Sequence, residues 1–468
     1  MKEIKKQVNA WIEANADGIV RDTVRLIQKY SPRTAGTEEK PFGEGPYEAL
    51  MEFFSVCDDL GFAHQNMDNC IGVADLGEGE PEIGILCHLD VVPIGPGWTM
   101  PATEGIVKDG KIFGRGAIDD KGPAVATLYA MKAIKEMGVE LKKPVRFIVG
   151  TDEESGSEDI PHYKKYAKMP SMLFTPDGGY PVINIEKGMS RNEFARAYTV
   201  SELLPRIAYA KGGATINAGP GEACCRIEGM NAAEAEAYYH ALPCGVKAAA
   251  AAVDGGVEIS FKGTSAHAST PDEGINAVTG MIAYLSALPL ANADEKETVS
   301  ALCRLFPHGK VNGEGLNLDI KDEKSGALTC AFSVFSLENG KAAGKCDIRF
   351  PVCTSVPEVK ERIGAALAAE QFELTASRGS EPHETPEEGA FVQTLLRTYH
   401  EETGNEAYCV AIGGGTYVHH EEGGVAFGAE FPGAADHHMH GPDEFVEIEE
   451  LVLNAKIFAQ AILNLQEV

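Results

Sequence analysis

The chain has 468 residues, which exceeds what one hydrophobic core usually supports, so we expect at least two domains. Its composition, 44% hydrophobic and 24% charged residues, is typical of a globular protein. A formal net charge of -29 argues against nucleic acid and anionic membranes as partners, because the surface would repel polyanions.

The N-terminal stretch MKEIKKQVNAWIEANADGIVRDTVRLIQKY alternates charged and apolar residues at helical spacing. It lacks the apolar core and the small-residue cleavage site of a secretion signal. No window is apolar enough to span a bilayer, and the 11 cysteines are scattered without a CxxC pair. We therefore expect reduced thiols and a cytoplasmic location, with no membrane partner.

Predicted helices and strands alternate up to about residue 187. Apolar runs in EIGILCHLD, VRFIVGTDEE and SMLFTPDGG each end in acidic residues or histidine. Between the first two lies GPAVATLYAMKAIKEMG, an amphipathic helix with Pro123 near its start and Gly138 at its end. Strand, helix and strand in that order predict parallel pairing in an α/β sheet. Ligands of such sheets bind at the carboxyl ends of the strands.

The pattern changes after NIEKGMS. Two similar passages follow, ACCRIEGMNAAEAEAYYHAL and KCDIRFPVCTSVPEVKERIGAALAAE, each a predicted strand, turn and helix. We interpret the alanine run at 248–252 as a helix end or a loop. From about residue 385, FVQTLLRTYHEETG, AYCVAIGGGTY and EIEELVLNAKIFAQAILNL return to the α/β pattern. The prediction is a discontinuous domain, 1–187 and 385–468, carrying an inserted α+β domain, 188–384, of two related ferredoxin-like units.

Polar residues that could carry chemistry follow the apolar strands. His88 and Asp90, in IGILCHLDVVP, share one side of a strand end because side chains at i and i+2 point the same way. Taken alone, they suit an ordinary polar turn. Asp119 and Asp120, in GRGAIDDKGP, precede a helix, where capping of free backbone N–H groups is the simplest interpretation.

Further carboxylates and imidazoles occur in three other segments. Glu153 and Glu154 follow a strand in GTDEESGSED, and Asp177 follows another in FTPDGG; each alone suits a polar loop. DHHMHGPDE adds a histidine cluster of the kind that is often merely solvated. Together, however, these carboxylates would repel one another strongly in one cleft without a cation. Mixed imidazole and carboxylate ligands suit zinc, with manganese or cobalt as relatives, and a bridging carboxylate would hold two ions about 3.5–4 Å apart.

The chain also resembles a known family. HLDVVPIGPGW, DGKIFGRGAIDDKGP, GTDEESGS, TPDGGYP and HMHGPDE look like the signature segments of co-catalytic zinc exopeptidases related to carboxypeptidase G and aminoacylase. GTSAHASTPDEGINA, CDIRFP, IGGGTY and the large insert are similar to those of bacterial PepV-type dipeptidases. The resemblance runs from about residue 80 to 445. It implies an α/β zinc-peptidase catalytic domain of the phosphorylase/hydrolase-like type, with a central mixed sheet, and an inserted lid domain.

The resemblance implies two divalent metal ions, zinc first, with manganese or cobalt as alternatives. The implied ligands are His88, Asp119, Glu154, Asp177 and His440. Asp119 would bridge both ions, and Asp90 would orient the imidazole of His88. Glu153 would be the general base that takes a proton from the attacking water. His438 is an alternative to His440, which is preferred for its spacing to the acidic pair in HGPDE.

The inserted domain would contribute to substrate binding. The resemblance makes His267 a hydrogen-bond donor to the oxyanion and Asn217 a second polar contact from the lid. A histidine in SAHAS is otherwise most often structural. Arg349 would bind the terminal carboxylate of a peptide, although it could pair with a local acid. The backbone around Gly414 and Gly415 would form a carboxylate nest, or simply a flexible turn.

One departure bears on substrate preference. Relatives commonly follow GGGTY with a small residue and a basic one, whereas Val418, His419 and His420 follow here. The resemblance therefore does not carry the contact made by that basic residue over to this chain, and substrate preference is open at this point.

These inferences predict a metal-dependent dipeptidase that acts on short peptides, including β-alanyl dipeptides as candidates, and that works as a monomer. An N-acyl amino acid deacylase with the same metal site is the alternative. A non-catalytic metal-binding scaffold would need neither Glu153 nor His267. A serine hydrolase is disfavoured because no GxSxG elbow lies beside a strand.

Overall fold

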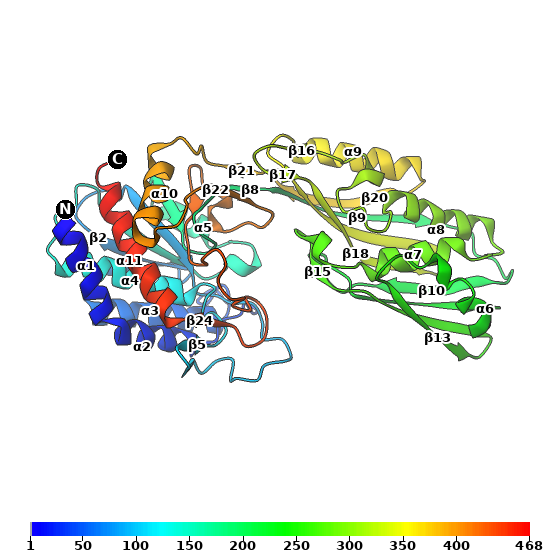
Figure 1. The fold of residues 1–468 in the computed structure, drawn as a ribbon, viewed down its shortest axis with the longest axis horizontal. Coiled ribbons are helices and arrows are strands. Elements are labelled where there is room, and N and C mark those ends of the chain that lie inside the picture. The colour runs from blue at the N-terminus through cyan, green and yellow to red at the C-terminus, as the bar shows by residue number, and fades with distance from the viewer. Residues whose placement is uncertain (1) are drawn as a thin grey trace. The chain divides into compact units, whose positions relative to one another are not determined.

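A computed structural model describes residues 2–468 and divides into two compact units, which are taken separately (Figure 1). The first unit contains the chain up to Ile185, Glu384–Val410 and Gly415–Val468. The second contains Glu186–His383 and Ala411–Gly414. The sequence-based boundaries lie within two residues of the two main ones, but the glycine-rich segment Ala411–Gly414 was not expected to belong to the second unit.

A nine-stranded mixed sheet forms the centre of the first unit, in the order β1-β2-β6-β3-β7-β23-β8-β21, with β22 paired to β8. The strands are β1 His64–Met67, β2 Ile71–Leu76, β3 Ile83–His88, β6 Val145–Gly150, β7 Met172–Thr175, β8 Val182–Glu186, β21 His383–Glu384, β22 Cys409–Ile412 and β23 Val425–Ala426. As predicted, β3 runs parallel to both β6 and β7. The carboxyl ends of these three strands therefore meet at one edge of the sheet.

Helices cover both faces of this sheet. They are α1 Lys2–Ala14, α2 Ala16–Ile27, α3 Glu44–Leu60, α4 Lys121–Glu136, α5 Ile160–Tyr166, α10 Ala390–Thr403 and α11 Ile448–Leu465. All but α5 bury apolar side chains in one large core, and α5 packs into a smaller core on the other face. The predicted helix between the first two strands is α4, which is buried along most of its length because it is apolar nearly all round.

A small three-stranded sheet lies in the same unit. It joins β4 Ile106–Lys108, β5 Lys111–Phe113 and β24 Phe445–Glu447 in the order β24-β5-β4. Phe113 and Phe445 are direct partners. The pairing therefore brings the segment before Asp119 beside the segment after His440, although more than 300 residues separate them in sequence.

The second unit is built on an eight-stranded antiparallel sheet in the order β13-β14-β12-β10-β18-β19-β9-β20. Its strands are β9 Gly188–Ala197, β10 Arg206–Gly212, β12 Glu222–Glu228, β13 Lys247–Val253, β14 Gly256–Lys262, β18 Thr329–Glu338, β19 Lys341–Phe350 and β20 Glu373–Ser380. Its helices are α6 Ala232–Glu236, α7 Ala277–Ala287, α8 Ala293–Leu305 and α9 Val356–Ala369. The helices lie along one face of the sheet (Figure 1) and share its core.

The two halves of this sheet have the same arrangement. The order β13-β14-β12-β10 on one side corresponds to β20-β9-β19-β18 on the other, and the halves join between β10 and β18. In the chain, α6 connects β12 to β13 just as α9 connects β19 to β20. The two similar passages found in the sequence are therefore β12–α6 and β19–α9, which occupy equivalent places in the two halves.

The interpretation of the alanine run as a helix end or loop is wrong. Residues 248–252 lie in β13, which pairs with β14 along its whole length, from Lys247 opposite Lys262 to Val253 opposite Gly256. Alanine has little intrinsic preference for strands, so the pairing with β14 decides the conformation here.

Membrane and disulfide features are simple. No helix within residues 2–468 is both long enough and apolar enough to cross a membrane. All 11 cysteines are free thiols.

Candidate metal centre and active site

The predicted metal ligands of the first unit come from separate elements that end at one edge of its sheet. His88 is the last residue of β3, and Asp177 follows β7 by two residues. Glu153 and Glu154 follow β6 in the short 3-10 turn Glu153–Ser155. Asp119 precedes α4. Parallel pairing of β3, β6 and β7 therefore assembles these side chains from segments far apart in the sequence.

Asp119 lies between two histidines. Its Oδ1 is 2.9 Å from Nε2 of His88, and its Oδ2 is 2.8 Å from Nε2 of His440. His440 Nε2 is also 3.1 Å from Oε1 of Glu154. One carboxylate thus presents each of its oxygens to a different imidazole, which is the arrangement a bridging ligand requires.

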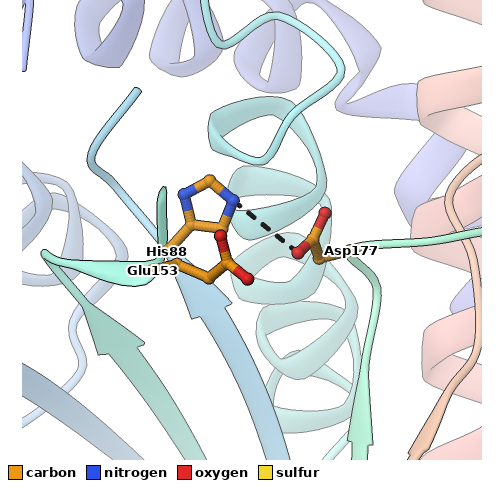
Figure 2. A group of neighbouring side chains, drawn as sticks. All are labelled: His88, Glu153 and Asp177. Atoms are coloured by element: carbon orange, nitrogen blue, oxygen red, sulfur yellow. Dashed lines mark ion pairs between the residues drawn. The ribbon is translucent and has the colours of Figure 1, made fainter. Parts of the chain in front are cut away.

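Two overlapping groups of side chains could each hold a cation. In one, ligand atoms of His88, Glu153 and Asp177 lie within 4.8 Å of one another, and Figure 2 shows the three side chains converging. The dashed line marks the 3.8 Å approach of His88 Nε2 to Asp177 Oδ2. The second group combines His88 with Asp119 and Glu154 within the same limit.

Crowding perturbs the acids of this cluster. Burial, followed by the charge of Asp177, raises the pKa of Glu153 well above its usual range. Burial and the charge of Asp119 raise the pKa of Asp177 to about 7, and they also raise the pKa of Glu154. These carboxylates disfavour one another's ionisation, and a divalent cation among them would remove that penalty.

The same surroundings favour the charged form of the histidines. Burial opposes the charged form of each and is the largest single effect, but the hydrogen bonds and charges of the surrounding carboxylates, Asp119 first, together raise the pKa of His440 to about 11 and that of His88 well above its usual range. The same hydrogen bonds lower the pKa of Asp119 although burial alone would raise it. His88 Nε2 and Asp119 Oδ1 lie 2.9 Å apart, but each is buried without a well-aligned hydrogen-bond partner, as expected of atoms that bind a metal ion. The donor set of imidazole nitrogen and carboxylate oxygen fits zinc-type ions.

Asp90 has a broader contact set than the sequence suggested. His88 Nδ1 lies 3.0 Å from the backbone oxygen of Asp90 and 3.5 Å from its carboxylate. The carboxylate itself accepts the backbone N–H groups of Glu153 and Glu154, each at 3.1 Å. Asp90 therefore fixes the turn that carries Glu153 and Glu154 as well as approaching the His88 ring.

The side chain of Asp120 does not cap α4, although capping was the simplest interpretation of its position in the sequence. Its side chain makes no cap hydrogen bond to α4. Its Oδ2 instead accepts the backbone N–H of His88 at 3.1 Å, and the residue is fully buried. Asp120 thus supports the backbone at the end of β3, a role that sequence spacing did not indicate.

The three histidines near the C-terminus have different environments. His440 alone approaches Asp119 and Glu154, as preferred from the sequence. His438 Nδ1 faces the backbone oxygen of Pro442 at 3.2 Å. His437 is buried between Glu430 and Glu450, whose hydrogen bonds raise its pKa to about 9. The geometry therefore places His440, and neither neighbour, in the cluster.

A buried ion pair next to this cluster was missed. Arg115 pairs with Glu444, and both side chains are almost inaccessible. Arg115 Nη2 also donates to the backbone oxygens of His440 and Gly441 at 3.0 and 3.1 Å. Both residues belong to segments that carry predicted ligands, GRGAIDD and HGPDE, but neither segment showed that the two would pair.

In the second unit, β11 Ala218–Gly219 and β15 Ala266–His267 form a short ribbon that brings Asn217 beside His267. Ala218 is the direct partner of His267, and the backbone oxygen of Asn217 accepts the N–H of Ala268 at 2.9 Å. His267 Nδ1 lies 2.6 Å from Oγ of Ser269. This hydrogen bond holds the exposed imidazole in one orientation.

Arg349 is held on β19 of the same unit. Its Nε and Nη2 donate to the two oxygens of buried Asp347 at 2.7 and 3.2 Å, and its Nη1 donates to the backbone oxygen of Gly413 at 2.7 Å. A guanidinium has five N–H donors. Two remain, one on each terminal nitrogen, which suits a carboxylate ligand.

Glycine is required at Gly413, the first glycine of the IGGGTY loop. A Cβ there would lie 2.7 Å from Cβ of Ser269. Gly414 has room for a side chain, and neither Gly413 nor Gly414 has a φ in the left-handed region. This contact with Ser269 gives a packing reason for glycine at Gly413, and the carboxylate nest at Gly414 and Gly415 stays a prediction.

Tyr417, four residues after Gly413, anchors the loop's continuation in the first unit. It is fully buried, and its hydroxyl donates to Asp159. Asp159 also accepts the backbone N–H groups of Thr151 and Asp152, directly before Glu153.

An α/β unit that gathers imidazoles and carboxylates at the carboxyl edge of its parallel strands, joined to an antiparallel α+β unit, has the architecture of a metallopeptidase. The family model described as peptidase family M20/M25/M40 matches residues 84–464 of the chain. The chain belongs to this family.

Relatives and solved structures agree with this assignment. YtjP of Bacillus subtilis (strain 168) is 35% identical over 457 residues, covering 96% of this chain and 97% of its own. The Beta-Ala-Xaa dipeptidase of Lactobacillus delbrueckii subsp. lactis is 34% identical over 468 residues, covering 97% of each chain. The crystal structure of human carnosine dipeptidase 1 shares the fold with a TM-score of 0.58 and 16% identity, covering 99% of each chain.

Proposed function

We propose that the protein is a metal-dependent dipeptidase that hydrolyses short peptides with a free C-terminal carboxylate. The observation that carries this proposal is Asp119, whose two oxygens face His88 and His440 in a buried cluster of carboxylates. The name of the Lactobacillus delbrueckii relative supports the substrate class and makes β-alanyl dipeptides candidate substrates.

Two divalent ions, zinc in the first place, would be held by the predicted ligands. These ligands are His88, Asp119, Glu154, Asp177 and His440. When bound, the ions would supply Lewis acidity that lowers the pKa of water and polarises the scissile carbonyl.

Glu153 is the proposed general base. Its carboxylate would take a proton from the attacking water and return it to the nitrogen of the leaving amine. It lies within 4.8 Å of possible ligand atoms of His88 and Asp177, while Asp90 holds its backbone. Glu154 is needed as a ligand, so the two neighbouring acids have separate roles.

The second unit would bind the substrate and act as a lid. His267 would donate a hydrogen bond to the developing oxyanion, with Asn217 as a second polar contact. Arg349, through its two remaining N–H donors, and the backbone of Gly414 and Gly415 would hold the terminal carboxylate. A carboxylate clamp of this kind limits substrates to short peptides with a free C-terminus.

A monomer in the cytoplasm is part of the proposal. The two similar halves of the second unit already pair with each other within one chain, through β10 and β18. The 11 free cysteines are in keeping with a reducing compartment.

The test is hydrolysis of a panel of free-amine dipeptides and N-acyl amino acids by the purified protein, stripped of metal and then restored with zinc, manganese or cobalt. Glu153→Gln should lower kcat for dipeptides by roughly 10²- to 10⁴-fold while the metal content stays unchanged. Glu158→Gln is the matched control, because Glu158 lies in the same segment but is exposed and pairs with Arg33. If the protein cleaves N-acyl amino acids and no dipeptide, the dipeptidase proposal is wrong and the protein is a deacylase.

A further inference from the structure

Three arginines stand on neighbouring strands of the second unit, on the sheet face that its helices leave open. They are Arg349 on β19, Arg191 on β9 and Arg378 on β20. Asp347 is the direct partner of Arg191, and Arg191 is the direct partner of Arg378. Direct partners of an antiparallel pair share a face, as do Asp347 and Arg349 at i and i+2. On β9 the alternate residues Ser190, Asn192 and Phe194 are buried beneath this face.

Arg191 and Arg349 share one carboxylate. Arg191 Nε donates to Oδ2 of Asp347 at 3.1 Å, and Arg349 binds both Asp347 oxygens. That single bond uses one of the five donors of Arg191. The side chain is 37% exposed, so its remaining donors are open to a ligand.

The charges in this row do not balance. Three guanidinium groups accompany one carboxylate, and within residues 2–468 the exposed Arg378 has neither an ion pair nor a side-chain hydrogen bond. Like charges directly opposite each other across a strand pair are destabilising. A solvated surface side chain is the simplest interpretation of Arg378 alone. That interpretation does not explain why three arginines, Arg349 among them, accompany one carboxylate in a protein of net charge -29.

The row extends in one direction from the proposed carboxylate clamp. On one side of Arg349 lies the His267 loop, because Thr329, the direct partner of Arg349 on β18, donates to the backbone oxygen of Ala268 at 3.4 Å. On the other side lie β9 and β20. Moving away from His267, the order is therefore Arg349, then Arg191, then Arg378.

We propose that Arg191 and Arg378 form an anion subsite for an acidic side chain on the C-terminal residue of the peptide. The inference rests on the proposed function, since it takes Arg349 as the ligand of the terminal carboxylate. Arg349 and Arg191 are diagonal neighbours on adjacent strands, but their side chains converge. Arg191 Nε and Arg349 Nη2 lie 3.1 and 3.2 Å from the same oxygen of Asp347, which puts these two nitrogens no more than about 6 Å apart. The two carboxylates of a C-terminal aspartate or glutamate are separated by roughly 4–5 Å at ordinary bond lengths. One carboxylate on Arg349 thus places the other within reach of Arg191, with the long side chain of Arg378 closing from the next strand.

The experiment compares alanylglutamate with alanylglutamine, which has nearly the same shape but a neutral side chain, as substrates of the metal-loaded protein. The wild type should have the higher kcat/KM for alanylglutamate, mainly through a lower KM. Arg378→Gln should reduce the ratio of the two kcat/KM values by about 3- to 10-fold, and Arg378→Lys should restore part of it. Raising the ionic strength should reduce the wild-type ratio.

Arg362→Gln is the matched control, because Arg362 is an exposed arginine of the same unit that lies on α9 and pairs with Glu358. It should leave the ratio unchanged. A wild-type preference for alanylglutamine, or an equal ratio in wild type and Arg378→Gln, overturns the anion subsite and leaves the dipeptidase intact. Failure of the wild type to cleave any free-amine dipeptide overturns the proposed function itself, and the subsite with it.

Discussion

Asp90 shows how one side chain can serve two neighbouring residues with different roles. Its carboxylate accepts the backbone N–H groups of both Glu153 and Glu154, and it also approaches the ring of His88. Removing the carboxylate would leave two donors of the turn without their acceptor. The consequence should therefore appear in the placement of the proposed base and not only in metal binding.

Replacing Asp90 separates these two contributions. Asp90→Ala should lower kcat by about 10- to 100-fold, the range typical of groups that orient metal ligands. Asp90→Asn keeps one carbonyl oxygen as an acceptor and should lose less. Steady-state kinetics and titration of zinc against a chromophoric chelator measure the two effects. A loss of zinc affinity equal to the loss in kcat would show that Asp90 acts through His88 alone.

Glu295, near the start of α8 in the second unit, gives a prediction about pH and stability. Its side chain is buried, and burial raises its pKa to about 7, although the N–H of Ile207 donates to it at 3.2 Å. The folded pKa of Glu295 lies above the unfolded one, so the neutral, protonated carboxyl makes its full contribution to the stability of the fold below about pH 4.5. That contribution is lost as the pH rises through about 7 and the buried carboxyl ionises.

Glu295→Gln should remove this dependence while keeping an oxygen for Ile207. At pH 8 the variant should be more stable than the wild type by about 2–3 kcal/mol, and at pH 4.5 the two should be nearly equal. Urea unfolding at both pH values, followed by circular dichroism, measures the difference. Equal stabilities at pH 8 would mean that the folded protein accommodates the charge of Glu295 without penalty.

At the scale of elements, the loop that carries His440 is tied to the segment that carries Asp119. Arg115 pairs with Glu444 and donates to two backbone oxygens of the His440 segment. Glu444 in turn accepts the N–H groups of Gly116 and Ile118 at 2.9 and 3.2 Å. The pair therefore holds the backbone of the segment before Asp119 against that of the segment around His440, the two segments that carry these proposed metal ligands.

Breaking this pair should weaken both the fold and the metal centre. Arg115→Met leaves the buried Glu444 without its partner and should destabilise the first unit by roughly 3–5 kcal/mol. Zinc affinity should fall by about 10- to 100-fold. The double variant Arg115→Met/Glu444→Gln should recover stability without recovering zinc affinity.

The control for this prediction is Lys142→Met, which removes an ion pair with Glu467 whose partners are both more than half exposed. Such a pair contributes about 0–1 kcal/mol. Thermal unfolding and chelator competition measure both quantities. Unchanged zinc affinity in Arg115→Met would show that other contacts, such as the pairing of β24 with β5, suffice to position His440.

At the scale of elements, local patterns in the sequence predicted some strands, whereas contacts between distant segments could not be predicted. The carboxyl ends of β3, β6 and β7 were predictable because apolar runs alternate with a helix, and that order forces parallel pairing. The strand at the alanine run was not predictable, because its conformation is decided by pairing with β14 and alanine itself has little preference for strands. The Arg115–Glu444 pair and the contact of Asp120 with His88 join segments whose meeting depends on the packed fold, so no spacing in the chain reveals them.

At the scale of the whole molecule, the two units have separate hydrophobic cores. All five proposed metal ligands belong to the first unit, whereas Asn217, His267 and Arg349 belong to the second. A ligand that binds one folded unit stabilises that unit alone, by about 2.7 kcal/mol at a free concentration 100 times its dissociation constant. Metal should therefore act unequally on the unfolding of the two units.

Calorimetry of the metal-stripped protein should show two unfolding transitions, of which zinc shifts only one upward, by several degrees. The responsive transition belongs to the first unit, because its five proposed ligands come from five segments that separate when it unfolds. Glu295→Gln, measured at pH 8, provides the assignment by raising the other transition. A single transition that moves as a whole with both zinc and Glu295→Gln would contradict independent unfolding and show that the two cores unfold cooperatively.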